Sequence, residues 1–168
     1  MGARVNAYLG YGVHLPDEQF DDLPWAIIEY DDEDDGSPKE TKLNFKGWVT
    51  QLAGLVDPSA HIVDRDDEWE AWYKDSANAE AMSTFWRQQR QAEANFPIGV
   101  INVYTGDSGD PCIILAVKST ISVGWWGDPR PAVTTVDDTA LQTAVEFCSQ
   151  HNIPFENPQW LLVAEYGD

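Results

Sequence analysis

The stretch "TGDSGDPC", residues 105–112, contains the letters that surround the nucleophilic serine of trypsin-like proteases. Such an enzyme needs a histidine base, a carboxylate that orients it, and two β-barrels that bring them together. The only partial match to the histidine motif is at His61, and only 46 residues separate it from Ser108. This interval is too short for the missing barrel halves, and Asp110 replaces a glycine of the motif. We therefore expect no protease.

A hairpin loop explains the same letters. Runs of β-branched residues flank the stretch, Gly106 and Gly109 tolerate a positive φ, and Pro111 suits the first residues of an edge strand. An enzymatic alternative remains, in which Asp107 and Asp110, or the acidic run at 31–35, hold a catalytic metal ion.

The acidic run "DDEDDG" matches the first positions of an EF-hand calcium loop. The twelfth position is Lys42 instead of a bidentate glutamate, and Pro38 interrupts the loop. The sequence therefore predicts an exposed acidic loop at about 31–40, with incidental divalent-cation binding as the alternative. Its acids are Asp31, Asp32, Glu33, Asp34 and Asp35.

A second acidic cluster, "DRDDEWE", opens the longest helical pattern of the chain. Carboxylates at a helix N-terminus interact favourably with the helix dipole, so capping is one interpretation. Capping explains two or three acids but not the excess over the whole chain, for which solubility and a docking surface for a basic partner are the two interpretations. The candidate residues are Asp64, Asp66, Asp67, Glu68 and Glu70.

Other reactive residue types lack the spacing of known sites. The three histidines have no metal-ligating companion at short spacing, and no phosphate-binding glycine motif is present, so we expect no cofactor. Cys112 and Cys148 are too few for a disulfide scaffold and are expected to be reduced thiols. In "WWGDPRP", the sequence favours plain packing of Trp125 and Trp126, and the alternative is that one packs in the core and the other contacts a protein partner.

Charge constrains the partner more strongly than any motif. The 168 residues carry 29 acids and ten Lys or Arg, a formal charge of -19. Such a field repels nucleic acid and anionic membranes and attracts cationic partners. Seventeen of the acids lie in residues 1–70, so this part is expected to carry the stronger field.

Length and hydropathy predict one folded domain over residues 1–168. No apolar run is long enough to span a membrane, and the first 15 residues lack a signal-peptide pattern, so we expect a cytoplasmic protein.

The elements needed to position these residues follow from periodicity and turn signals. The sequence predicts an α+β domain with a mainly antiparallel sheet. The N-terminal half is expected to contain a strand at 4–15, an ambiguous apolar run at 25–28, a strand turning into a short helix at 41–55, and a long helix at 66–95 interrupted at Asp75 or Asn78. The C-terminal half is expected to contain an antiparallel meander at 98–126, a helix after Asp138 and a final strand at 159–166. In the helix after Asp138, one face carries Leu141, Ala144, Val145 and Cys148.

The segments "AYLGYGVHLP" and "LQTAVEFCSQHNIPFENPQWLLVAEYGD" resemble small acidic accessory proteins of tailed bacteriophages. The resemblance covers about a quarter of the chain and carries no catalytic motif. It implies expression in the cytoplasm of a bacterial host, often to alter host or defence proteins, and it transfers no functional residue.

These observations predict a non-enzymatic acidic protein that binds a basic surface of a protein partner. One form of this hypothesis is a DNA-mimic inhibitor of a nucleic-acid-binding protein in phage counter-defence. The alternative is a structural or assembly protein, or a homo-oligomer joined through the aromatic meander and the terminal strand, whose acidity serves solubility.

Overall fold

The computed structural model describes residues 4–30, 38–62, 67–105, 110–125 and 132–167. These residues form four α-helices and seven β-strands, which confirms the α+β class and the mainly antiparallel sheet. The chain groups into two compact units, which we call unit 1 (residues 1–43 and 97–168) and unit 2 (residues 44–96). A single domain over residues 1–168 stays a prediction.

The sheet of unit 1 is built around one long strand, β1 (Arg4–Leu15), which confirms the predicted opening strand. Gly12 lies opposite both Ala116 and Gln159, and Ala7 lies opposite both Gly124 and Ala164. A residue can have two such partners only across the two edges of its strand. Strand β7 (Gln159–Gly167) therefore runs along one edge of β1, while β5 (Asp110–Val117) and then β6 (Ser122–Trp125) follow one another along the other.

The predicted meander over 98–126 is wrong in its third strand. β4 (Ile98–Thr105) pairs with β5 as expected, but β6 pairs with β1. A short 3₁₀ turn, Lys118–Thr120, separates β5 from β6. The Thr120 hydroxyl accepts a hydrogen bond from the Tyr11 N–H (2.9 Å) and donates one to the Val117 carbonyl (2.7 Å). This buried side chain satisfies backbone groups where the ladder is interrupted, so the chain stays on β1 instead of folding back on β5.

The glycines of "GYG" in β1 allow close approach to β5. A Cβ on Gly12 would lie 1.8 Å from the Leu115 carbonyl oxygen, and one on Gly10 would lie 2.9 Å from the Ala116 Cβ. The first contact is with backbone, so no side-chain rotation relieves it. The sequence predicts a bend or a close packing contact at Gly10 and Gly12, and the structure shows the close contact, since Gly12 has no room for a side chain.

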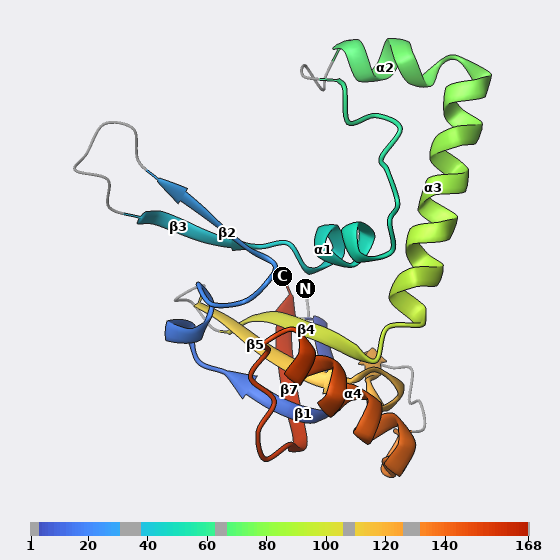
Figure 1. Ribbon diagram of the computed structural model, residues 1–168. Coiled ribbons are helices and arrows are strands. Elements are labelled where there is room, and N and C mark those ends of the chain that lie inside the picture. The colour runs from blue at the N-terminus through green and yellow to red at the C-terminus, as the bar shows by residue number, and fades with distance from the viewer. Residues whose placement is uncertain (1–3, 31–37, 63–66, 106–109, 126–131, 168) are drawn as a thin grey trace. The chain divides into compact units, whose positions relative to one another are not determined.

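The core of unit 1 surrounds β5, whose residues 113–117 are all buried. Ile101, Val103, Ile114 and Ala116 form a cluster on one face of the sheet. Helix α4 (Asp138–Gln150) contacts β5, and Figure 1 shows it beside the sheet. Ala144 and Cys148 are buried on α4, as predicted, but Val145 is exposed because the buried stripe is narrower than the apolar pattern.

A separate two-stranded hairpin of β2 (Ala26–Tyr30) and β3 (Pro38–Leu43) belongs to unit 1, after the 3₁₀ turn Asp17–Gln19. The ambiguous run at 25–28 is thus mostly strand. The predicted loop at 31–40 is too long, because β3 begins at Pro38, which tolerates the first position of an edge strand. Residues 31–37 lie outside the described residues.

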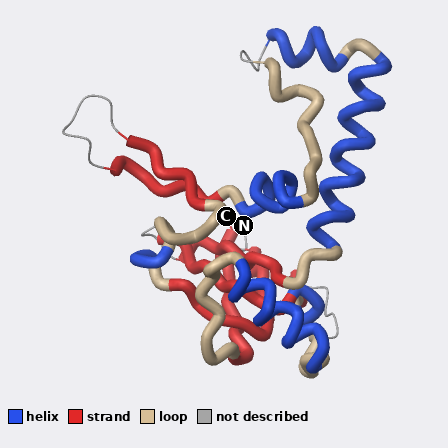
Figure 2. Tube along the Cα trace, in the orientation of Figure 1, coloured by secondary structure: helices blue, strands red, loops and turns tan. Residues whose placement is uncertain are grey.

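The described residues of unit 2 contain helices and loops but no strand, as the blue and tan segments of Figure 2 show. Its helices are α1 (Phe45–Leu52), α2 (Asp67–Tyr73) and α3 (Ser76–Ala94). In the segment predicted as a strand turning into a short helix, the strand ends at Leu43, because the Asn44 side chain accepts a hydrogen bond from the Gly47 N–H (2.9 Å) and starts α1. The long helical pattern divides at Asp75, whose carboxylate accepts from the Ala77 N–H (2.8 Å) and caps α3.

Aromatic and polar contacts join α1 to α3. Phe45, Trp48 and Phe96 meet with ring centroids 5.7–6.0 Å apart. The Gln89 side-chain amide donates to the buried Thr50 hydroxyl (2.7 Å).

Among the described residues, none of the helices in either unit is both long and apolar enough to cross a bilayer.

Candidate binding surfaces

Four aromatic side chains, Trp69, Trp72, Tyr73 and Trp86, form a connected surface on unit 2, which we call the aromatic surface. Trp69 contacts both Trp72 and Tyr73 with centroids 5.5 Å apart, and its plane is within 22° of the Tyr73 plane. The ring of Tyr73 contacts Trp86 at 6.2 Å. Two helices therefore contribute to one continuous set of rings.

Local sequence places these rings. Trp69 precedes Trp72 by three residues and Tyr73 by four, the spacing at which helical side chains share a face. The break at Asp75 ends α2 and lets it pack against α3, so that Tyr73 reaches Trp86. His61 adds an edge contact to Trp72 at 5.9 Å.

The aromatic surface remains open on the described residues. Tyr73 is 38% exposed and Trp86 is 36% exposed, whereas Met82, on the same helix as Trp86, is 2% exposed. A helix that hides Met82 and Phe85 yet displays a tryptophan has separate core and surface faces. Large exposed aromatic groups are typical of protein contact sites.

Carboxylates accompany the rings. Glu68 and Glu70 are exposed on α2, and Glu80 is exposed on α3. Lys74 forms an ion pair with Glu70 (3.0 Å) four residues before it. From Asp67 to Trp86 the sequence has five acids and one base, so the surroundings of the aromatic surface are strongly acidic.

The structure describes only part of the predicted acidic sites. Glu68 and Glu70 are exposed on α2, the helix that carries three of the four rings, and Asp67 begins α2. Trp125 ends β6 opposite Asn6. The remaining predicted residues, Asp31, Asp32, Glu33, Asp34, Asp35, Asp64, Asp66 and Trp126, lie outside the described residues.

The hairpin predicted around "TGDSGDPC" is confirmed by its strands, since Thr105 of β4 lies opposite Asp110 of β5. Asp107 and Ser108 lie outside the described residues. Within the described part of the chain, no three His, Cys, Asp or Glu side chains gather as metal ligands do. Cys112 and Cys148 are both free thiols, and burial raises the pKa of Cys148 to about 12.

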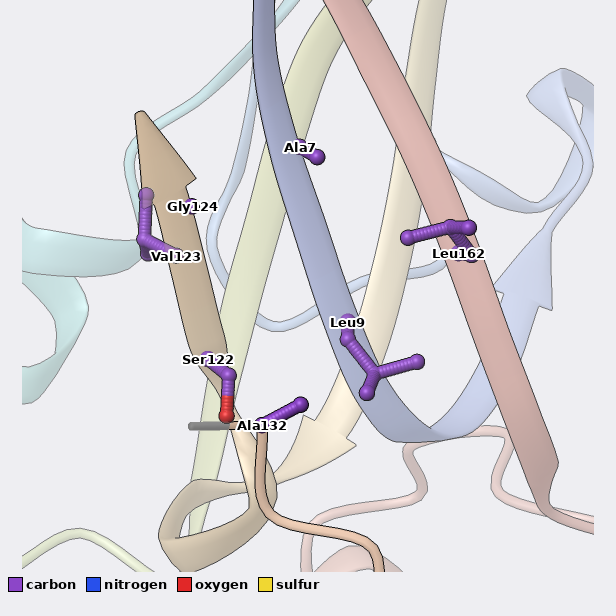
Figure 3. A pocket seen from close by; sticks show the side chains of 7 residues that line it. All are labelled: Ala7, Leu9, Ser122, Val123, Gly124, Ala132 and Leu162. Carbon is purple, nitrogen blue, oxygen red and sulfur yellow. The ribbon is translucent and has the colours of Figure 1, made fainter. Parts of the chain in front are cut away.

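A second candidate surface lies in unit 1, on the face of the sheet where Ala7 and Leu9 of β1 meet Leu162 of β7. These side chains line an open pocket of about 420 Å³ together with Ser122, Val123, Gly124 and Ala132. Figure 3 shows the contributions of β1, β6 and β7 to it. Leu162 is 73% exposed, so this part of the sheet presents apolar area to solvent.

Comparisons with protein families, curated proteins and solved structures found no match to this chain. The candidate surfaces therefore rest on their own chemistry.

Trp69, Trp72, Tyr73 and Trp86 follow the three- or four-residue spacing of the helix predicted at 66–95, interrupted at Asp75 or Asn78. Such spacing is shared by core and surface faces of a helix. The signal that distinguishes a surface from a core was the density of acids between the rings. Spacing alone could not show that Tyr73 and Trp86 stay partly exposed, because exposure depends on what packs over the rings.

Proposed function

We propose that this protein functions by binding a protein partner through a basic surface of that partner. The observation that carries the proposal is the excess of carboxylates. With 29 acids and ten Lys or Arg, one-to-one pairing within the chain leaves 19 carboxylates without a basic partner. A field of this size accelerates the approach of a cationic surface and opposes that of an anionic one.

The described acids are placed where such a field is effective. Asp17, Glu18 and Asp22 are exposed around the 3₁₀ turn of unit 1, and Glu68 and Glu70 are exposed on α2 of unit 2. Acids therefore face solvent on both units instead of forming internal networks. Exposed charges of one sign favour association with the opposite sign more than they stabilise a fold.

The finer form of the proposal is a DNA-mimic inhibitor that occupies the groove of a nucleic-acid-binding protein. Duplex DNA carries one negative charge per ~1.7 Å of its axis, and a protein surface dense in carboxylates presents a comparable field. A role in phage counter-defence, in the host cytoplasm, rests on the resemblance of the terminal segments and is part of the same proposal.

Capture at two salt concentrations tests the proposal. The immobilised chain is expected to retain bacterial proteins at about 50 mM salt and to release most of them at about 200 mM, because phosphate-binding surfaces lose affinity steeply over this range. The retained proteins should bind labelled duplex DNA, and free chain should displace that DNA. A variant with Asp31–Asp35 changed to Asn and Ser should fail to compete; equal competition by this variant and the wild type would refute the DNA-mimic form.

A second candidate function is self-association in a structural or assembly role, which the exposed apolar face around Leu162 favours. Sedimentation of the wild-type chain and of Leu162→Lys distinguishes the two functions. A wild-type oligomer that Leu162→Lys dissociates supports assembly through this face. A wild-type monomer excludes it.

A further inference from the structure

We propose that the aromatic surface of unit 2 binds arginine side chains of the basic partner. This inference rests on the proposed function and specifies the contact surface and the chemistry that recognises the partner. It starts from the geometry of Trp69, Trp72, Tyr73 and Trp86, whose rings are joined in a chain by centroid distances of 5.5–6.2 Å.

Aromatic rings and carboxylates together define the ligand. The face of an indole or phenol ring attracts a cation, and tryptophan does so most strongly. Glu68 and Glu80 are exposed on the helices that carry the rings, while the only base between Asp67 and Trp86 is Lys74, which already pairs with Glu70. The surroundings thus favour a cationic group over a neutral or anionic one.

Arginine fits this combination better than lysine. Its guanidinium is planar, stacks on an aromatic face and still directs N–H groups at neighbouring carboxylates, whereas a lysine ammonium is more strongly hydrated. The bases of single-stranded nucleic acid also stack on exposed aromatic rings. Their phosphates would meet the acids of α2 and a chain of charge -19, so the observations favour a basic protein segment.

The rings do more than attach α2 to α3. If they served only as a small core, they would be closed from solvent as Met82 and Phe85 are on α3. Tyr73 and Trp86 instead leave more than a third of their surface open. Arg87 and Arg90 follow Trp86 along α3 and mark where the acidic stretch ends.

Binding of three labelled peptides of equal length to the full chain tests the inference. One peptide is arginine-rich, one carries lysine in place of arginine, and one carries glutamine. The wild type is expected to bind the arginine peptide more tightly than the lysine peptide, and the glutamine peptide least. Trp86→Leu and Tyr73→Leu should each weaken arginine-peptide binding by about threefold to fivefold, the effect of removing one exposed ring from a cation.

The chain offers a matched control. Trp160 of unit 1 is 37% exposed and contacts Tyr11 edge-on at 5.5 Å, so Trp160→Leu removes an equally exposed indole elsewhere. It should leave peptide affinity unchanged. Trp86→Phe keeps a ring at the site and should retain most of the affinity, and circular dichroism confirms that each variant keeps its helices.

The outcomes separate this inference from the proposed function. Salt-sensitive binding of both basic peptides that is unchanged by Trp86→Leu and Tyr73→Leu overturns the inference and leaves the proposed function standing. Failure of the wild type to bind either basic peptide at low salt counts against both. Equal binding of the glutamine peptide, or tighter binding of a single-stranded oligonucleotide, overturns the assignment of arginine.

Discussion

Strand β5 and helix α2 use their hydrophobic side chains in opposite ways. All five residues from Ile113 to Val117 are buried, on both faces of their strand. The seven residues of α2 carry three large aromatic rings, and Tyr73 remains 38% exposed. The same class of side chain thus forms a closed core in unit 1 and a partly open surface in unit 2.

This difference is consistent with the proposal that unit 1 supplies stability and the aromatic surface supplies recognition. A strand paired on both edges and covered on both faces contributes its full hydrophobic area to folding. A short helix that packs through ring edges contributes less and keeps area available for a partner. Binding sites are commonly drawn from such less stable parts of a structure.

The largest effect is expected at Gly12, where β1 meets β5. In Gly12→Ala the new Cβ would overlap the Leu115 carbonyl oxygen at 1.8 Å, so the strands must separate. We expect a loss of more than about 4 kcal/mol in the free energy of unfolding, measured by urea denaturation. Gly124→Ala is the control, because among the described residues beyond its chain neighbours the nearest atom to its Cβ would be the Ala7 carbonyl oxygen at 3.8 Å. Similar losses in both variants would contradict the packing argument.

Truncation of leucines should distinguish the two units directly. Leu115→Ala removes a fully buried side chain of unit 1 and should cost about 3 kcal/mol. Leu52→Ala removes a side chain of α1 that is 45% exposed and should cost less than about 1 kcal/mol. Chemical denaturation monitored by circular dichroism measures both. Equal costs would mean that unit 2 depends on burial as strongly as unit 1.

Within unit 2, the buried hydrogen bond between Gln89 and Thr50 is expected to contribute to the stability of the fold. Gln89→Leu removes the hydrogen bond to the Thr50 hydroxyl and should cost about 1.5 kcal/mol, measured by thermal unfolding. The adjacent Gln88 is exposed, so Gln88→Leu should change stability by less than about 0.5 kcal/mol. Without a difference between the two variants, the contact contributes nothing measurable.

The smallest effect concerns the closed core of unit 1 at alkaline pH. Burial raises the pKa of Cys148 from 9.0 to about 12, so the folded state holds a proton that the unfolded state releases. The stabilisation is complete below pH 9.0 and is lost as the pH rises toward 12. At about pH 10 the free energy of unfolding should fall by about 1 kcal/mol through this group. Cys148→Ala should show a shallower decline between about pH 8 and about pH 10, and an identical decline would show that Cys148 titrates normally.

Local patterns predicted much of the fold. The strand at 4–15, the hairpin around residues 105–110, the helix after Asp138 and the break at Asp75 all follow from periodicity and capping, which act between near neighbours. The error in the meander, by contrast, occurred where distant segments compete. The position of β6 depends on the Thr120 hydroxyl meeting the Tyr11 N–H, a contact between residues 109 apart in sequence.

The sequence by itself determined the charge, the class of partner that the charge favours, and the helical spacing of Trp69, Trp72 and Tyr73. Only the tertiary structure decided that α2 packs against α3 with Tyr73 on Trp86, and that both rings stay partly exposed. Charge and spacing are properties of single residues and near neighbours. Burial depends on which distant segments cover a side chain, and that is fixed only when the chain has folded.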